Sequence, residues 1–573
     1  MTLMVLDKYH NWSTKVAREF SGSSELQTTF TVEEKPVRFW NPRSRKTATA
    51  VGAALLAVSL IGCSGQGGTA STGEAAGSKQ DADTLVITRA GDPTSLDPAV
   101  SVATGSGLET LSAFYERLVN VEPDGTIIPA LAESWEISED GLAYTFHLRE
   151  GVLFHDGSPF TAEEVRYTWQ RIVGLNDQAA QYWPNVSDVE VVDDTTAVIR
   201  LNKLDPTFLS VLGGQRGVYM GPSKACVEAN EAAAGDWAVD HFVDHECGTG
   251  AYELESWNHD ETITFTAFED YWQGWDGAHV TKVVQQIVSE PSTVQMLLTQ
   301  GDVDLAADNL PMQVLQQLKD QSGVVVDVAD STTIDQMVFN LYEGPTTDPR
   351  VREAISLLFD YDAAIQQAYA GQAERIATGL PSTVWPEVTE GLVPMERDVE
   401  RAKELLAEAG YPDGFELEFA YADINQWSSL ALILEASLGE GGIKVKPVPS
   451  TWPVLFEKLG NSSYGMAGYQ MWAAYPDPND ILMWWNTDQK NFINPGWGDA
   501  ASDALITQAT ETLDVEVRAD LYRQVVERLK ADMPAVWVDQ PMQQTALRDY
   551  VSGFVYNPYY NGLLDFYALS KTA

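Results

Sequence analysis

The sequence predicts a mixed fold of strands and helices, of the α/β or α+β class. Apolar and polar residues alternate over residues 262–268 and 144–148, which is typical of half-buried strands in antiparallel hairpins. Apolar residues follow helical spacing over residues 399–409, and Gly410 provides the stop. Because both periodicities occur along one chain, the sequence fits neither an all-helical nor an all-strand protein.

Two further helices are indicated by their starting residues. Thr161 precedes a helical run, and Glu164 stands three residues later, at the capping-box position. Phe160 and Val165 flank this start with the spacing of a hydrophobic staple. A second start is predicted at Asp348, where a proline follows and apolar residues recur on one face.

The composition excludes several classes of protein. The 573 residues include 36 Lys and Arg against 83 Asp and Glu, a formal net charge of −47, and 44% are hydrophobic. This apolar content excludes a fibrous or disordered chain, and three cysteines are too few for a disulfide-stapled one. The acidity argues against nucleic acid and anionic lipid as partners, because both require clustered Lys and Arg. We therefore expect a globular protein of several domains or two large lobes, with a solvated acidic surface.

Residues 43–63 are typical of an export signal. A basic stretch, RSRK, precedes a small and apolar run that is shorter than the roughly 20 residues of a membrane span. The run ends in LIGC, which resembles the bacterial lipobox, and this resemblance implies that Cys63 is diacylated and becomes the mature N-terminus. An ordinary secretory signal with an incidental cysteine is the alternative. Residues 1–62 are then an upstream extension and signal peptide, and residues 63–83 a flexible tether.

The lipobox resemblance implies a location on the extracytoplasmic face of the cell membrane, with lipid as the only anchor. Residues 1–36 precede the basic stretch and have no place in an ordinary signal. This favours a later start of translation, with Val37 as the candidate initiator.

Clusters of turn-forming residues divide the remaining chain. None of them is long enough to be a flexible linker, so they predict lobes joined by short crossings. Such a geometry suits hinge closure over a ligand. The clusters are residues 213–214, 344–345, 412–414 and 475–479.

A family resemblance begins in residues 130–165. This stretch contains LAESW, DG, YTFHLR, FHDG and FTAEEV in that order, and it resembles the signature of family 5 extracellular solute-binding proteins. These are the peptide, opine and nickel type of ABC importer. The resemblance covers residue 85 to the end, and its other matches are TSLDP (94–98), GTGAY (248–252), GDVD (301–304), DPRVR (348–352) and YPDP (475–478).

The resemblance implies a two-lobed fold of the periplasmic-binding-protein type, type II and of the large peptide-binding subclass. Lobe I would span residues 84–334, with a subdomain at about 120–205, and lobe II residues 335–537. Residues 538–573 would return to lobe I. The two hinge crossings are expected near residues 331–335 and 536–540, with the solute between the lobes. The implied partners are an ABC permease and a separate ATPase, and the implied state is a monomer.

The resemblance also implies which residues face the solute. In the family's peptide binders, a loop of the form WxADYPDP lies between the lobes, and its first Asp pairs with the ligand's amino terminus. Here Ala474 occupies that position, so the simplest partner for a free amine is missing. Asp477, between two prolines, is expected to be structural. The candidate ligand-binding residues are Trp472, Ala474, Tyr475, Trp452, Ala103, Thr104, Gly105, Thr333 and Asp335.

Cys226 and Cys247 are the remaining cysteines, and in an exported protein they are expected to form a disulfide. A zinc site with His241 and His245 is the alternative. It is less favoured because the nearby thiol of Cys247 is expected to pair with Cys226. We therefore expect no metal and no cofactor.

No hydrolase, nucleotide-binding or zinc-protease motif occurs in the sequence, so no catalytic residue is proposed. The favoured function is capture of an oligopeptide or peptide-like solute for an ABC importer. An oligosaccharide is the alternative solute, because aromatic residues surround residues 472–478. A secreted hydrolase and an envelope signalling lipoprotein are alternatives of other classes.

Overall fold

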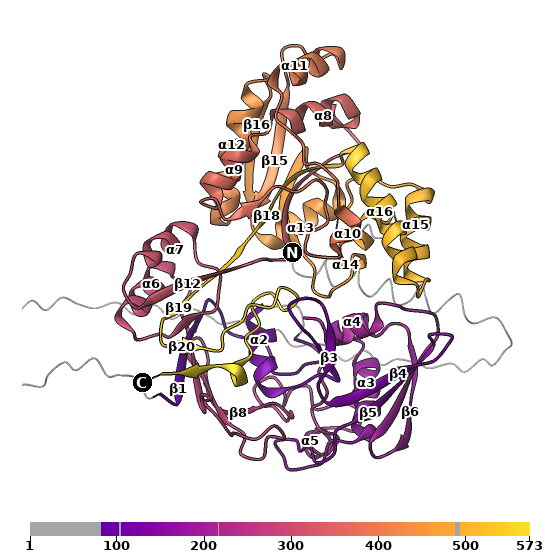
Figure 1. The fold of residues 1–573 in the computed structure, drawn as a ribbon, viewed down its shortest axis with the longest axis vertical. Helices are drawn as coiled ribbons and strands as arrows, with labels where there is room; N and C mark the ends of the chain where they lie inside the picture. The colour runs from indigo at the N-terminus through magenta and orange to yellow at the C-terminus, as the bar shows by residue number, and fades with distance from the viewer. Residues whose placement is uncertain (1–81, 102–104, 216, 488–492, 573) are drawn as a thin grey trace, which may run out of the picture. The chain divides into compact units, whose positions relative to one another are not determined.

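The computed structural model describes residues 82–101, 105–215, 217–487 and 493–572 (Figure 1). The predicted lipobox cysteine Cys63, the tether up to residue 81 and the candidate residues Ala103 and Thr104 lie outside the described residues. The fold is α/β with two lobes, each built on its own sheet, as the sequence and its family resemblance predict.

Lobe I is built on a seven-stranded sheet in the order β12-β19-β11-β1-β10-β9-β8. β1 runs parallel to both β10 and β11, and the other pairs are antiparallel. Figure 1 shows β1 in indigo and β19 in yellow, so strands from both ends of the described chain share this sheet. The strands are β1 (Thr84–Arg89), β8 (Tyr252–Asn258), β9 (Thr262–Ala267), β10 (Lys282–Ile287), β11 (Leu305–Ala306), β12 (Val324–Ala329) and β19 (Gln543–Arg548).

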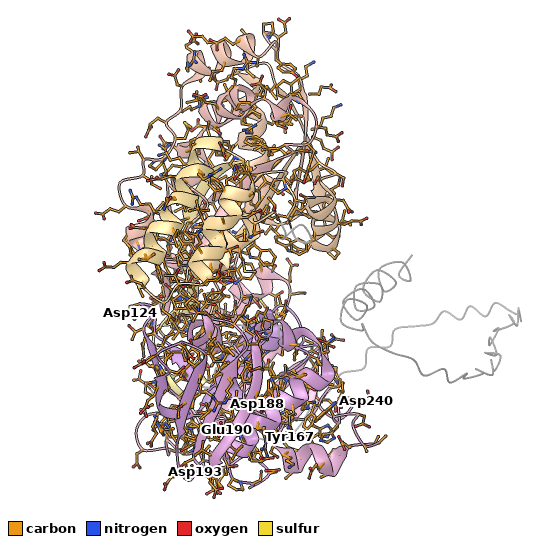
Figure 2. All side chains as sticks on the ribbon, turned by 90° about the vertical axis from the view of Figure 1, so that its right-hand side faces the viewer. Asp124, Tyr167, Asp188, Glu190, Asp193 and Asp240 are labelled. Atoms are coloured by element: carbon orange, nitrogen blue, oxygen red, sulfur yellow. A yellow bond between two sulfur atoms is a disulfide. The ribbon has the colours of Figure 1, made fainter. Side chains whose placement is uncertain are left out.

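A four-stranded antiparallel sheet, in the order β4-β5-β7-β6, forms a subdomain of lobe I. Its outer strand β6 alternates buried Val189 with exposed Asp188 and Glu190, and the acidic side chains line the surface seen in Figure 2. The strands are β4 (Ala132–Ile137), β5 (Ala143–Leu148), β6 (Val186–Asp193) and β7 (Thr196–Leu201).

Helix α3 (Ala162–Leu175) packs on this subdomain and begins where the sequence predicts. Phe160 and Val165 are both buried at its start. The predicted capping box is wrong in detail, because the Thr161 side chain makes no cap hydrogen bond. The Glu164 carboxylate accepts instead from the backbone N–H of Lys224, at 2.9 Å. A neighbouring segment therefore supplies the donor that the helix start was expected to supply.

Lobe I contains further short elements that complete its core. A two-stranded sheet pairs β2 with β3, and a second pairs β20 with β21 near the C-terminus. These elements are α2 (Gly105–Phe114), β2 (Val119–Val121), β3 (Ile127–Pro129), α4 (Phe208–Gly213), α5 (Lys224–Asn230), α6 (Pro291–Gln300), α7 (Met312–Lys319), β20 (Val551–Ser552) and β21 (Ser570–Lys571).

Lobe II is built on a six-stranded mixed sheet in the order β14-β18-β13-β17-β15-β16. β13 lies between β17 and β18 and runs antiparallel to both. The strands are β13 (Thr333–Phe339), β14 (Ala373–Glu374), β15 (Glu416–Ala422), β16 (Lys444–Ser450), β17 (Met466–Trp472) and β18 (Ala535–Pro541).

Helices surround the lobe II sheet, and a large buried apolar cluster fills the lobe. The helix predicted at Asp348 begins there, and the Asp348 carboxylate caps it by accepting from the Arg350 N–H. Figure 1 shows α8, α9, α11 and α12 gathered around β15 and β16. The helices are α8 (Pro349–Leu358), α9 (Tyr361–Ala368), α10 (Pro386–Thr389), α11 (Val399–Glu408), α12 (Asn425–Gly439), α13 (Trp452–Asn461), α14 (Asn479–Leu482), α15 (Ala500–Thr510) and α16 (Val515–Asp532).

Two short segments carry the chain between the sheets. The chain leaves lobe I after β12 and enters lobe II at β13, and it returns between β18 and β19. The outgoing crossing spans residues 330–332, and the return crossing is at residue 542. β13 and β18 are adjacent, so the two crossings lie side by side.

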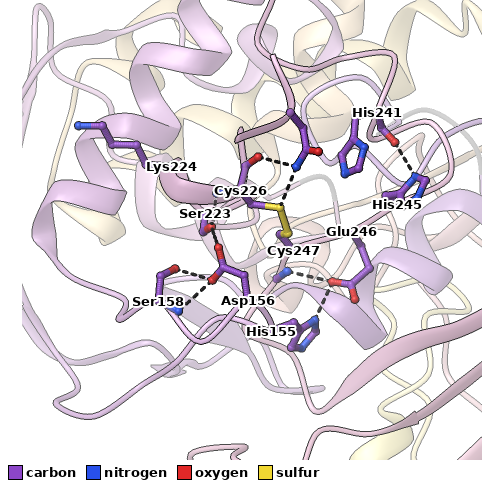
Figure 3. Close-up of a disulfide and its surroundings, with 12 residues drawn as sticks. His155, Asp156, Ser158, Ser223, Lys224, Cys226, His241, His245, Glu246 and Cys247 are labelled. Atoms are coloured by element: carbon purple, nitrogen blue, oxygen red, sulfur yellow. Dashed lines mark hydrogen bonds and ion pairs between the residues drawn. A yellow bond between two sulfur atoms is a disulfide. The ribbon is translucent and has the colours of Figure 1, made fainter. Parts of the chain in front are cut away.

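Cys226 and Cys247 form a disulfide in lobe I (Figure 3). Asp156 lies beside them and accepts from the Ser223 hydroxyl at 2.6 Å. Among the described residues, these three form the one set whose metal-ligating atoms lie within 4.8 Å of one another, and the disulfide occupies both sulfurs. His241 and His245 stack on each other, with ring centroids 4.2 Å apart, instead of joining this set.

Within the described part of the chain, every helix is too short or too polar to cross a lipid bilayer.

Candidate functional site

Gln215 of lobe I contacts both lobe II and the C-terminal segment. Its backbone N–H donates to the carbonyl of Ala474 in lobe II, at 2.8 Å, and to that of Tyr559 in the C-terminal segment, at 3.1 Å. Its side-chain Oε1 accepts from the indole Nε1 of Trp472, at 3.0 Å. We call the contact of residues 214–215 with residues 472–476 and Tyr559 the seam.

A close backbone approach makes the seam possible. A Cβ at position 214 would lie 2.4 Å from the carbonyl oxygen of Ala474, so only glycine fits there. Arg117 fixes the same segment from lobe I, donating to the Gln215 carbonyl at 3.2 Å and to the Tyr219 hydroxyl at 2.7 Å. Both lobes therefore hold this short segment by directed hydrogen bonds.

The crossings are tied directly to the seam. The Thr332 hydroxyl contacts the carbonyls of Ala473, at 3.0 Å, and of Pro558, at 3.1 Å. In β18, directly before the return crossing, the Gln540 side chain donates to the Ser331 carbonyl of the outgoing crossing, at 2.6 Å. A change in the angle at the crossings must therefore disturb the residues that join the lobes.

The YPDP turn is held from inside lobe II by a buried ion pair. Arg518 of α16 lies 2.5 Å from the Asp477 carboxylate, which also accepts from the Tyr522 hydroxyl at 3.2 Å. Burial raises the pKa of the Asp477 carboxyl, and the positive charge of Arg518 opposes that rise. The Trp385 indole donates to the Pro476 carbonyl, at 3.2 Å. Asp477 is thus used in positioning the loop, in agreement with the structural role expected for it.

Ala474 is 1% exposed and brings no charged group to the loop. Its backbone N–H donates to the carboxylate of Asp480, and the neighbouring Tyr475 hydroxyl accepts from the Asn479 amide at 3.4 Å. The position at which the family resemblance predicts an amine-binding carboxylate therefore carries a methyl group.

The other candidate residues fall in three places. Thr333 opens β13 directly opposite Trp472, next to the seam. Gly105 is the first residue of α2. Trp452 begins α13, where it stacks on Phe456 with ring centroids 5.4 Å apart and packs against the lobe II core. Trp472, Ala474, Tyr475 and Thr333 are thus brought together, while Trp452 is occupied in its own helix.

Asp335 lies two residues beyond Thr333 and faces a second carboxylate. It pairs with Asp539 of β18 on one side and with Gln470 of β17 on the other. Both carboxyl residues have no exposed surface. Burial raises the pKa of Asp335 to about 7 and raises that of Asp539 well above its usual value.

Several residues of this region were missed by sequence reasoning. The GG pair at 213–214 gave a turn signal, and its role in allowing close contact was not predictable from that signal. No local pattern marks the polar residues that join distant segments. They are Arg117, Gln215, Thr332, Asp539, Gln540 and Tyr559.

Two cavities within lobe II lie apart from the seam. One of about 480 Å³ is lined by α8, α16 and β18 residues, including Ser356 and Trp537. The other, of about 200 Å³, is lined by residues including Trp485 and Trp497. Neither lining includes a seam residue.

The family model for bacterial extracellular solute-binding proteins, family 5, matches residues 126–492. That span carries the subdomain, the outgoing crossing and the seam residues 214–215 and 472–476. The chain belongs to this family.

Relatives of this solute-binding protein match over nearly their whole length. Heme-binding protein A of Haemophilus influenzae is 30% identical over 535 residues, covering 87% of this chain and 94% of the relative. The probable D,D-dipeptide-binding periplasmic protein DdpA of Escherichia coli is 26% identical, with 85% and 94% coverage. Among solved structures, the Helicobacter pylori periplasmic binding protein DppA in complex with the peptide STSA is 27% identical. It matches with a TM-score of 0.71 over 85% of this chain and 98% of that one.

Substitution of Gly214 tests the seam of the solute-binding protein. In Gly214→Ala the new methyl group meets the Ala474 carbonyl, so the two hydrogen bonds of the Gln215 N–H should lengthen or break. At roughly 1 kcal/mol for each net hydrogen bond, affinity for the solute that copurifies with the protein should fall about tenfold or more. Calorimetry measures the affinity. Gly439→Ala is the matched control, because a Cβ there meets no neighbour. Equal affinities in the two variants would contradict the role of the seam.

Removal of Arg518 tests the ion pair under the loop. Arg518→Met leaves Asp477 buried without its cation, and we expect a loss of about 3–5 kcal/mol in the free energy of unfolding. The native carboxyl then holds its proton to higher pH than the unfolded one, so the loss should grow as the pH rises from 4 to 8. Urea titration at several pH values measures this. The double variant Asp477→Asn/Arg518→Met should recover part of the stability, and a loss that is the same at every pH would refute the explanation.

Proposed function

We propose that this chain captures an oligopeptide or peptide-like solute between its two lobes and delivers it to an ABC permease with a separate ATPase. Family membership supports the role as the solute-binding component of an ABC importer. Relatives and structural neighbours named as dipeptide-binding or solved with a peptide support the solute class. We further propose that the protein acts as a monomer.

The observation that carries the proposal is the position of the seam beside both crossings. Trp472, Ala474 and Tyr475 lie where the lobes meet, and Thr332 links the same loop to the outgoing crossing. A solute that touches both lobes here stabilises the arrangement in which the seam hydrogen bonds form. Occupancy is thereby converted into a lobe geometry that a permease can recognise.

The chemistry of the loop limits which class of solute can bind beside it. A buried ammonium without an anionic partner costs several kcal/mol, and Ala474 provides none. A peptide with a blocked or modified amino terminus fits this position better than one with a free amine. The half-buried Trp472 ring also suits a sugar face, so an oligosaccharide remains the competing solute.

Native mass spectrometry of the protein as purified should detect a bound peptide or modified peptide. The measurement separates the candidates, since a bound oligosaccharide would refute the peptide proposal. Ala474→Asp should raise affinity for free-amine peptides about tenfold to a hundredfold over N-acetylated ones, the range of a charged hydrogen bond. Ala474→Asn, with the same shape and no charge, should not. An unchanged preference in Ala474→Asp would show that this loop does not contact the ligand's amino end.

We also propose that lipid attached to Cys63 holds the protein at the extracytoplasmic face of the cell membrane. The basic stretch, the apolar run and LIGC in residues 43–63 support this anchor. Cells fed labelled palmitate should label the wild-type protein and not Cys63→Ser, and the variant should leave the membrane fraction. Label on Cys63→Ser, or none on the wild type, would refute the anchor.

A further inference from the structure

Two carboxyl groups meet on the strands that connect the lobes. Asp335 is the third residue of β13, and Asp539 lies opposite it in β18. A register shift follows this pair, between Asp335 and Gln336. The two aspartates therefore occupy the end of each strand nearest the crossings, two residues from Thr333 and from Pro541.

Neither carboxyl group reaches solvent. Both residues are 0% exposed. Both carboxylate oxygens of Asp539 and Oδ1 of Asp335 have no hydrogen-bond donor within the described structure. Burying a carboxylate oxygen without a hydrogen-bond donor costs free energy. These oxygens therefore require a donor hydrogen in addition to those of the neighbouring groups.

The groups around the pair cannot supply that donor by themselves. The Tyr369 hydroxyl, at the end of α9, donates to Oδ2 of Asp335, and Gln470 of β17 interacts with Asp335 from the other side. Among the described residues, no Lys, Arg or His contributes an electrostatic interaction to either carboxyl. Two ionised carboxylates would therefore face each other without a cation.

A proton resolves this conflict. An ionised carboxylate only accepts hydrogen bonds, whereas a protonated carboxyl also donates one. Two adjacent carboxyl groups in a site without cations cannot both ionise, because their like charges repel in a medium of low dielectric constant. With one proton, one aspartate donates to the other, and the charge of the pair falls from −2 to −1.

We propose that Asp335 and Asp539 share one proton, and that this proton joins β13 to β18 where the chain passes between the lobes. This inference goes beyond solute capture and does not depend on which solute is bound.

The shared proton predicts a direction for the effect of pH. Burial raises the pKa of both carboxyls above the values that they have in the unfolded chain. The native protein therefore holds protons that the unfolded chain releases, and stability falls as the pH rises above about 4. Below about pH 7, where the pKa of Asp335 lies, both carboxyls hold a proton; above it the pair shares the one that remains, and the fall due to Asp539 continues to higher pH.

The first test observes the proton itself at pH 8. The pKa of Glu164 is raised to about 6 and that of Glu116 to about 7, so both are largely ionised at this pH. The infrared spectrum of the purified wild-type protein should then contain a protonated carboxylic acid band that Asp539→Asn lacks. The exposed Asp188→Asn is the control and should keep the band. Identical spectra for wild type and Asp539→Asn would overturn the proposal.

The second test measures stability from pH 5 to pH 9. Relative to Asp539→Asn, the unfolding equilibrium constant of the wild type should rise up to about tenfold for each pH unit. Asp335→Asn should remove the part of the dependence that lies below about pH 7, which keeps the test available if one variant does not fold. Parallel pH profiles for wild type and both variants would overturn the proposal. So would stabilisation of the wild type alone by added calcium without the acid band, because a metal ion would then occupy the pair.

Discussion

The backbone N–H of Gln215 joins three segments that are far apart in the sequence. It contacts carbonyls of the lobe II loop and of the C-terminal segment at once, and this requires a glycine immediately before it. The position of Trp472, the tie through Thr332 and the link to Arg117 all depend on this approach. Since the contacts are mainly to backbone atoms, they constrain the distance between segments more than they constrain side-chain identity.

Local patterns of the sequence were sufficient for several elements and for the family. The alternation over residues 262–268 corresponds to β9, and the helix starts at Asp348 and Ala162 are those of α8 and α3. These features depend on residues that are close together in the chain, so hydrophobic periodicity and capping residues are enough to predict them. The ordered motifs of residues 130–165 identified the family because they all lie in one local architecture, the hairpin and helix of the subdomain.

The site was only partly predictable, for a physical reason. The Gln215 contacts span 259 residues to Ala474 and 344 to Tyr559 (474 − 215 and 559 − 215), and a single polar residue carries no signal of such a partner. Trp472 and Ala474 were predicted because they lie in a family motif, and the structure shows them in contact with Gln215. Trp452 shared the aromatic character of that region, but its ring is used in stacking on Phe456, one turn along its own helix. Aromatic composition thus pointed to this region of the sequence, but it did not separate a residue of the seam from one that packs within its own helix.

Buried charge in lobe II follows one rule at two carboxylate sites of the described residues. Asp477 forms an ion pair with Arg518, which balances its charge within the protein. Asp335 and Asp539 have no cation, and a shared proton is the remaining way to lower their charge. The loop of residues 472–476 also adds no uncompensated negative charge, because Ala474 places no carboxylate next to Asp477 and Asp480. An uncompensated ammonium in the solute would break this balance, whereas amide groups would satisfy the polar atoms of the loop without adding charge. The absence of a carboxylate at residue 474 therefore fits a solute that is recognised through neutral, peptide-like groups.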